Sequence, residues 1–131
     1  EHPPAHVTFY DLRNKDIPLP ISTYMPFDID PIQMRPIDQK WGQTGSRHGA
    51  HNIWLDMEKN DLIYIAWFNA GLRIIDWSNP FNPKEVGSYI PAGNKERCCP
   101  QSNDVYVDKE TGLIYMSDRW GLGLHILEYT G

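Results

Sequence analysis

The sequence has few cysteines, few basic residues and no long apolar run, and each shortage excludes a class of protein. The two cysteines are the neighbours Cys98 and Cys99, which cannot crosslink distant elements as a disulfide scaffold requires. The formal net charge of −5 has the wrong sign for a nucleic-acid binder, which places basic side chains against phosphates. No apolar run approaches the roughly 18 residues of a membrane-spanning helix. We therefore expect neither a nucleic-acid partner nor a membrane span.

Familiar catalytic motifs are missing as well. The sequence has no glycine-rich phosphate loop, no Gly-x-Ser-x-Gly and no His-Glu-x-x-His, the motifs that mark several large enzyme classes. Long helices are not expected either, because 11 prolines and 10 glycines interrupt the chain and no segment keeps an apolar period of about 3.6 residues. The composition predicts an all-β chain and leaves open whether the chain is an enzyme.

What the sequence does contain is an internal repeat. The segments 51–56, 62–66 and 71–76 recur in the same order and with matching residue types as 103–108, 113–117 and 123–128. A shorter copy stands at the start, since 7–11 matches 72–76 and 24–26 matches 89–91. This agreement in order, spacing and residue type indicates repeated structural units.

Each unit predicts a four-stranded antiparallel sheet. The strands of the full copy are expected at about 51–56, 62–67, 71–76 and 85–90, because these short β-branched and aromatic runs are bounded by Gly, Pro, Asn or Asp. Four-stranded sheets repeated in this way are the blades of a β-propeller. We predict the end of one blade at 5–26, a long loop at 27–50, a full blade at 51–91, a loop at 92–102 and a last blade without its fourth strand at 103–131.

The number of blades raises a problem of closure. About two and a quarter blades cannot form a ring, since closed propellers have about four to eight blades. The sequence also begins at Glu1 without Met or an apolar signal segment, as expected of a processed chain or a piece of a longer one. We expect the C-terminal part of a larger propeller, whose partners are the remaining blades of the same protein; a ring of several copies of the chain is the alternative. The outer faces of the end blades are apolar, so an isolated chain should not be a stable closed monomer.

One stretch resembles a known family. Gly-Leu-Arg-Ile-Ile-Asp at 71–76, continued by Trp-Ser-Asn-Pro at 77–80, resembles the LVIVD repeat, and the stretch 101–131 is similar to the C-terminal repeat of such proteins. The resemblance covers about 48–131 and, more loosely, 5–26. It implies a propeller and a secreted, periplasmic or cell-surface location, because these repeats occur in prokaryotic proteins of that kind. A more distant resemblance is to the selenium-binding-protein and methanethiol-oxidase propellers, some of which bind metal through histidines.

Candidate site residues lie where the first strand of each blade lines the central channel. The candidate ligand-binding residues are Arg47, His48, His51, Asn52, Asn103, Asp104, Arg119 and Trp120. One interpretation is a transition metal (copper, zinc or iron) bound by His48, His51 and Asp104, with further ligands from other blades. The other is that these residues hydrogen-bond to backbone groups, which the repetition of their positions favours.

Arginines, cysteines and tryptophans leave further alternatives open. Arg47, His48 and Arg119, with Lys95 and Arg97, would make a basic patch for an anion or pair with nearby carboxylates. Cys98 and Cys99 form a vicinal disulfide, hold a soft metal or remain two thiols. Trp54 and Trp67 are expected between blades, whereas Trp41 and Trp120 are loop residues that could stack on a ligand.

Two functions follow from these interpretations. The first is a non-catalytic binding or interaction scaffold, secreted or on the cell surface, with a protein or small-molecule ligand at the channel mouth. The second is a metal-dependent oxidoreductase with a histidine-bound metal in the channel. In both, the segment 28–49 is expected to be an excursion, and not a pair of blade strands, that covers the channel mouth, because loops of this length tend to be functional or disordered.

Overall fold

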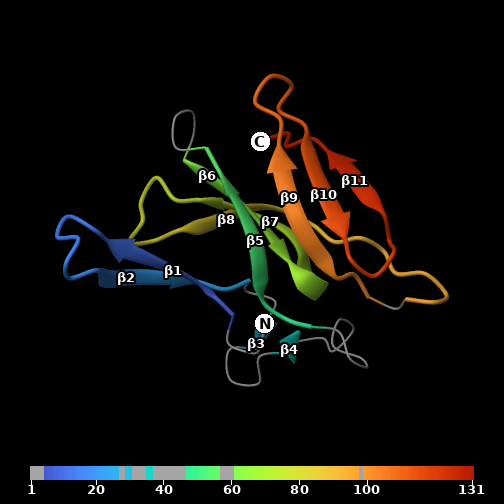
Figure 1. Cartoon of the computed structure of the whole chain (residues 1–131), viewed down its shortest axis with the longest axis horizontal. Coiled ribbons are helices and arrows are strands. Elements are labelled where there is room, and N and C mark those ends of the chain that lie inside the picture. Colours follow the sequence, from blue (N-terminus) through green and yellow to red (C-terminus); the bar gives the residue numbers. More distant parts are fainter. Residues whose placement is uncertain (1–4, 27–28, 31–34, 37–46, 57–60, 98) are drawn as a thin grey trace.

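Antiparallel sheets make up the part of the chain that the computed structural model describes, residues 5–26, 29–30, 35–36, 47–56, 61–97 and 99–131 (Figure 1). The first sheet holds β1 (Val7–Asp11) and β2 (Leu19–Tyr24), and a small sheet holds β3 (Ile29–Asp30) and β4 (Arg35–Pro36). The middle sheet holds β5 (Ala50–Leu55), β6 (Leu62–Trp67), β7 (Gly71–Asp76) and β8 (Lys84–Tyr89). The last sheet holds β9 (Ser102–Val107), β10 (Ile114–Asp118) and β11 (Leu124–Leu127).

The middle sheet is a four-stranded antiparallel meander in the order β5-β6-β7-β8. A single 3-10 turn, η1 (Phe68–Ala70), links β6 to β7 and ends at Gly71. The four strands of the middle sheet lie within one residue of the ranges expected from the sequence, because turn residues bound each apolar run. The prediction of an all-β chain with a four-stranded antiparallel sheet as its full blade is confirmed.

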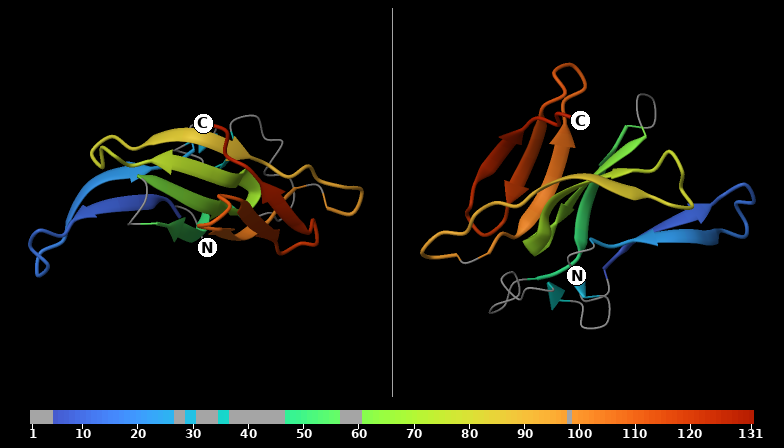
Figure 2. Two further views of the ribbon diagram at one scale, coloured as in Figure 1. Left: turned by 90° about the horizontal axis from the view of Figure 1, so that it is seen from above. Right: turned by 180° about the vertical axis from the view of Figure 1, so that it is seen from behind.

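The two central strands of the middle sheet, β6 and β7, are buried on both faces. On one face, Tyr64, Ala66, Leu72 and Ile74 pack against Val105, Val107, Ile114 and Met116 of the last sheet. On the other face, Ile63, Ile65, Trp67 and Ile75 pack with Tyr24, Val7 and Phe9 of the first sheet. Alternate residues of β6 therefore serve two separate cores, since side chains of a strand point to opposite faces. The three views show the middle sheet between the other two (Figures 1 and 2).

A buried ion pair adds a polar link between the first and middle sheets. Arg73 of β7 is 2% exposed, and its Nη1 lies 3.2 Å from Oε1 of Glu85 on β8. Arg73 Nε donates to the carbonyl oxygen of Ala70 at 2.9 Å, and the hydroxyl of Tyr24 on β2 donates to Glu85 Oε2. Charged groups in a core require such partners, because an isolated buried charge is costly. The network fixes β2 against β7 and β8.

The last sheet has an open face, the one turned away from the middle sheet. Its side chains repeat those with which the middle sheet packs against the last sheet. In the sequence repeat, Tyr115 takes the place of Tyr64, Leu124 that of Leu72, and Ile126 that of Ile74. The middle-sheet residues are at most 5% exposed, whereas Leu124 is 62% and Ile126 is 57% exposed. The same side-chain types thus face a neighbouring sheet in one unit and solvent in the next, as expected for a repeat that packs only against its neighbours.

The segment 28–49 contains one short pair of strands that belongs to no blade. Strands β3 and β4 pair, with Ile29 opposite Pro36 and Asp30 opposite Arg35. Proline is tolerated at the end of so short a ladder, because its missing N–H is not required there. The pair forms a sheet of its own and joins none of the others. The predicted cover over the channel mouth falls mostly on 31–34 and 37–46, which lie outside the described residues.

Gly71 provides a test of the β6–β7 turn. Its φ is +74°, and an added Cβ would lie 2.1 Å from the carbonyl oxygen of Tyr89. Gly112 has the same φ of +74° but no atom within 4 Å of an added Cβ, so it reports backbone strain alone. We expect Gly112→Ala to lower the free energy of unfolding by about 1 kcal/mol and Gly71→Ala by more than about 3 kcal/mol. Urea unfolding of the two variants at the same protein concentration measures both free-energy changes. Equal losses of unfolding free energy would contradict the close approach of Gly71 to the carbonyl oxygen of Tyr89.

The open face of the last sheet predicts self-association of the isolated chain. Contiguous exposed apolar surface of this kind drives association. We expect sedimentation to show oligomers at micromolar concentration, and Leu124→Lys with Ile126→Lys to shift the chain toward smaller species. The control is Ile17→Lys in the β1–β2 turn, whose side chain is 59% exposed. A chain that sediments as one monomer and unfolds cooperatively would overturn the prediction.

Candidate functional site

The candidate site lies where the first strands of the middle and last sheets meet. β5 and β9 are edge strands of their sheets and contact one another. His51 Nδ1 lies 2.7 Å from the backbone oxygen of Asn103, and the rings of Trp54 and Tyr106 are 6.4 Å apart further along. The structure therefore brings the starts of these two strands together. We call the residues around them, Arg47, His48, His51, Phe68, Asn69, Gln101, Asn103 and Arg119, the inner-strand cluster.

His51 contacts β9 through Asn103 and η1 through Phe68. Because a carbonyl oxygen only accepts, Nδ1 carries the proton that is donated to Asn103. The imidazole ring lies 4.7 Å from the ring of Phe68 in η1. Arg119, on the β10–β11 turn, places its guanidinium carbon 5.5 Å from the same Phe68 ring. The imidazole of His51 and the guanidinium of Arg119 thus both lie beside the Phe68 ring, whose aromatic face attracts the arginine cation.

His48 is oriented in a similar way. Its Nδ1 lies 2.7 Å from Oδ1 of Asn69, and its ring centroid lies 6.1 Å from that of Trp67. An amide oxygen accepts, so Nδ1 of His48 is also the protonated ring nitrogen when the imidazole is neutral. With Nδ1 as the donor in both contacts, a neutral imidazole keeps its lone pair on Nε2, which is then the ring nitrogen that can bind a metal ion or accept a proton.

Gln101 connects the segments that carry the two arginines. It is 1% exposed, and its side chain forms two hydrogen bonds with the backbone of Arg47: Arg47 N donates to Oε1 at 3.2 Å, and Nε2 donates to the Arg47 oxygen at 3.3 Å. The backbone oxygen of Gln101 accepts from Arg119 N at 3.0 Å. Arg47 and Arg119 are both exposed, so one buried residue holds the backbone of two exposed cations.

Asp118 orders the turn beside Gln101. Its carboxylate accepts hydrogen bonds from the backbone of Gln101, Trp120 and Leu122. The structure thus gives Asp118 a local role, with bonds to backbone N–H groups. Trp120 is half-buried and does not join the stack around Phe68: the guanidinium of Arg97 lies 5.7 Å from its ring and donates through Nε to its carbonyl oxygen.

Asp104 points away from the inner-strand cluster, and Asn52 is exposed on β5. Asp104 is exposed and lines a hollow on the open face of the last sheet with Tyr106, Ser117 and Leu124. Its Oδ1 accepts from the N–H of Val105 at 2.9 Å. The set His48, His51 and Asp104 is therefore not assembled, and among the described residues no three His, Cys, Asp or Glu side chains form a group that could hold a metal ion.

Carboxylates at the strand ends serve turns. Hydrogen bonds from the side chain and the backbone N–H of Arg13 lower the pKa of Asp11, those from Ser78 lower the pKa of Asp76, and the Thr111 hydroxyl lowers the pKa of Asp108. A carboxyl group with a lowered pKa stays ionised and is a poor general acid near neutral pH. Asp56 differs, because it is 3% exposed and lies 3.3 Å from Lys109 Nζ, which links the middle and last sheets.

The tryptophans divide as their positions in the repeat predicted. Trp54 packs on the core between the middle and last sheets, 5.7 Å from the Tyr64 ring, and Trp67 packs on the other core, 6.0 Å from the Tyr24 ring. Cys99 is buried. Trp41 and Cys98 lie outside the described residues, so the vicinal disulfide stays a prediction.

Sequence reasoning missed three members of the cluster. Phe68 and Asn69 occupy a short turn between two strands, where such residues usually indicate only the turn itself. Gln101 precedes a strand and carries no motif. One signal was available. Gln101 stands directly before an inner strand, in a segment with glycine and prolines, where backbone N–H and C=O groups outside the sheet need hydrogen-bond partners. The partners of Gln101 could not have been named, because Arg47 is distant in sequence.

Gln101 gives the test of this arrangement. Gln101→Leu keeps a similar volume but leaves the N–H and C=O of Arg47 without the amide, so we expect a loss of about 1–3 kcal/mol in the free energy of unfolding. Hydrogen exchange at the Arg47 amide should accelerate in the same variant. Asn52→Leu, an exposed change on β5, is the control and should alter stability by less than about 0.5 kcal/mol. Unchanged exchange at Arg47 would show that Gln101 does not hold this segment.

Comparison with known families confirms the resemblance seen in the middle of the chain. The family model of the LVIVD repeat matches residues 50–90, a range that contains all four strands of the middle sheet. LVIVD repeats build propellers, and the middle sheet is a blade of this kind. No curated protein and no solved structure matched the chain. The relation to the selenium-binding and methanethiol-oxidase propellers stays a prediction.

Proposed function

We propose that this LVIVD-repeat chain is a non-catalytic binding scaffold whose ligand, a protein or a small molecule, contacts the inner-strand cluster. The observation that carries the proposal is the hydrogen bonding of Gln101, which fixes the backbone of Arg47 and Arg119 on either side of the start of β9. Binding groups that are already ordered lose less conformational entropy when a ligand arrives.

The chemistry of the cluster also supports binding over catalysis. It presents arginine, imidazole and amide groups, which recognise ligands through charge and hydrogen bonds. The strand-end carboxylates whose pKa is lowered belong to turns. A secreted, periplasmic or cell-surface location fits a scaffold of this type and is tested by fractionating the native cells.

A second candidate, a metal-dependent oxidoreductase, is favoured by the tautomers of the two histidines. Metal-binding histidines commonly donate their other ring N–H to a protein oxygen, as Nδ1 of His48 and His51 does here. Imidazole ligands suit copper, zinc or iron. Because Asp104 lies on the other face of β9, this candidate requires ligands from outside the described residues.

Binding to the cluster can be tested with the purified protein and a panel of sugars, amino acids, dicarboxylates and nucleotides. A ligand at about 100 times its dissociation constant stabilises the folded state by about 2.7 kcal/mol, which a thermal-shift assay detects. We expect a compound that raises the melting temperature of the wild type to have a smaller effect on Arg119→Ala and His51→Ala. Lys84→Ala, an exposed change on β8, is the control.

The same preparations separate the two candidates. If the chain is a binding scaffold, elemental analysis of the purified protein should show no stoichiometric transition metal in either the wild type or His51→Ala. A stoichiometric metal that is lost in His51→Ala would contradict the scaffold and favour the oxidoreductase. A ligand whose shift is identical in wild type, Arg119→Ala and His51→Ala would place binding elsewhere on the molecule.

A further inference from the structure

The two arginines of the inner-strand cluster stand at positions where the two copies of the repeat differ. Arg119 follows directly on β10, whereas Phe68 follows directly on the equivalent strand β6. Arg47 precedes β5 by three residues, and Cys99 precedes the equivalent strand β9 by the same distance. A blade keeps in each copy the side chains that its own packing requires. The blade fold therefore requires a cation at neither position, and such departures from a local pattern are expected at functional sites.

A third departure from the repeat joins these two arginines. Gln101 stands directly before β9, where Gly49 stands directly before β5. The Gln101 side chain binds the backbone of Arg47, and the Gln101 carbonyl oxygen accepts the N–H of Arg119. A glycine has no side chain that could do the same. All three departures therefore belong to one hydrogen-bonded unit, which points to one shared role.

The charge of this unit is opposite to that of the whole chain. The formal net charge of the chain is −5, but the unit carries the guanidinium groups of Arg47 and Arg119, both exposed. The carboxylate of Asp118, next to Arg119 in the sequence, accepts hydrogen bonds from three backbone N–H groups. Asp104 lies on the open face of the last sheet. An anion is therefore attracted to this part of an otherwise acidic molecule.

The contact between Arg119 and Phe68 orders a cation without using a hydrogen-bond donor. The guanidinium carbon lies 5.5 Å from the centre of the Phe68 ring, and the attraction of an aromatic face acts on the positive charge. The N–H groups of a guanidinium form a planar fork that matches two oxygens of a carboxylate or a phosphate. The imidazole of His51, 4.7 Å from the same ring, adds a polar group beside this fork.

We infer that the ligand of the inner-strand cluster is a small molecule with a carboxylate or phosphate group, which is bound by Arg47 and Arg119. This inference rests on the proposed binding function and adds to it the chemical class of the ligand. Hydrogen bonds between a guanidinium and an oxyanion are about twice as strong as those between neutral groups. Because Gln101 already orders the backbone of both arginines, less conformational entropy is lost when the anion binds.

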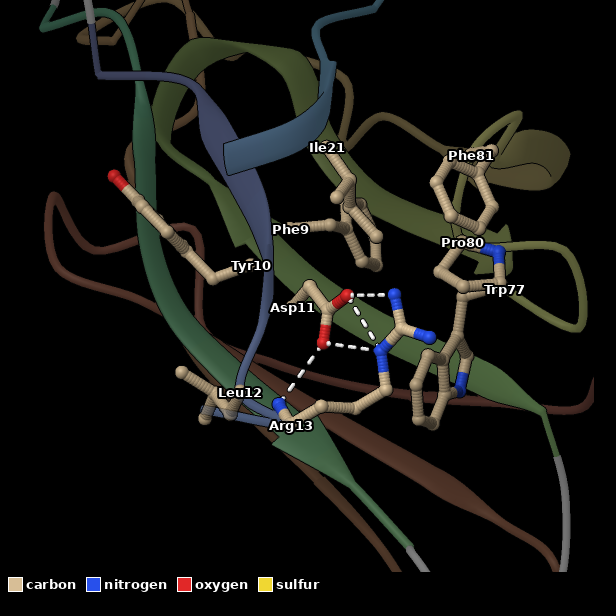
Figure 3. A pocket seen from close by; sticks show the side chains of 9 residues that line it. All are labelled: Phe9, Tyr10, Asp11, Leu12, Arg13, Ile21, Trp77, Pro80 and Phe81. Atoms are coloured by element: carbon tan, nitrogen blue, oxygen red, sulfur yellow. Dashed lines mark hydrogen bonds and ion pairs between the residues drawn. The ribbon is translucent and has the colours of Figure 1, made fainter. Parts of the chain in front are cut away.

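Arg13, in the β1–β2 turn, shows how an arginine serves a turn instead. Figure 3 shows its guanidinium turned back onto the carboxylate of Asp11. Arg13 Nη2 lies 2.6 Å from Asp11 Oδ2, and Arg13 Nε donates to both carboxylate oxygens. The Arg13 side chain is 89% exposed and belongs to the first sheet. Arg13 therefore provides a matched control, an exposed arginine outside the inner-strand cluster.

Two matched pairs of probes test the inference in a thermal-shift assay of the 131-residue chain. The first pair is succinate and succinamide, and the second is glucose 6-phosphate and glucose. The uncharged member of each pair keeps the carbon skeleton and lacks the anionic group, and sodium chloride equalises the ionic strength. We expect a charged probe at about 10 mM to raise the melting temperature by about 2 °C or more, and its uncharged partner to leave it unchanged. The pair that responds identifies the group as carboxylate or phosphate.

Variants of the chain locate the binding. Arg119→Gln and Arg47→Gln each remove one guanidinium at an exposed position, and each should weaken the active probe about tenfold in a titration of the melting temperature. Arg119→Lys keeps the charge but loses the planar fork, so its affinity should fall between those of the wild type and Arg119→Gln. Arg13→Gln removes the same charge elsewhere and should leave the affinity unchanged.

The outcomes separate this inference from the proposed function on which it rests. No shift with either charged probe would overturn the anionic ligand, and so would a shift of equal size in all the variants, because salts also stabilise proteins in a general way. An uncharged compound whose effect is lost in Arg119→Gln would overturn the anionic ligand and leave the binding scaffold in place. If no compound, charged or uncharged, acts in a manner that depends on Arg119, the scaffold at this cluster is wrong as well.

Discussion

Burial of both faces of β6 and β7 is the constraint on which the rest of the structure depends. Ile63, Ile65 and Trp67 require the first sheet, and Tyr64 and Ala66 require the last sheet. A sheet that is apolar on both faces cannot keep either face from water by itself, and burial of apolar surface is the main favourable term in folding. The three sheets therefore stabilise one another as neighbours, with the Arg73–Glu85 pair and Tyr24 as a polar link between two of them.

The inner-strand cluster is a consequence of this packing. Once the last sheet covers Leu72 and Ile74, its edge strand β9 lies against β5. His51 then meets the backbone of Asn103, and Gln101 meets the backbone of Arg47. Contacts between segments so far apart in the chain exist only because the cores on either side of β6 and β7 hold the sheets in place. The proposed binding function thus rests on groups that the core positions.

The same constraint explains why certain surfaces remain open. Leu124 and Ile126 repeat the chemistry of two buried residues of the middle sheet, yet no sheet of the described chain covers them. The edge of β1 repeats the edge of β7, but no strand among the described residues takes the place of β6. A repeat array presents at its ends the surfaces that it covers in its interior.

The sequence by itself determined the strands, their order and the packing of Trp54 and Trp67 between sheets, because alternation, turn residues and the repeat are local properties of the chain. It also indicated that His48 and His51 lie at the start of an inner strand. Only the tertiary structure decided which groups meet them. Asn69, Phe68 and Gln101 join the site through contacts between distant segments, and Asp104 leaves it because the pleat of β9 turns its side chain to the open face. No local pattern encodes those outcomes, since they depend on how one sheet is placed against the next.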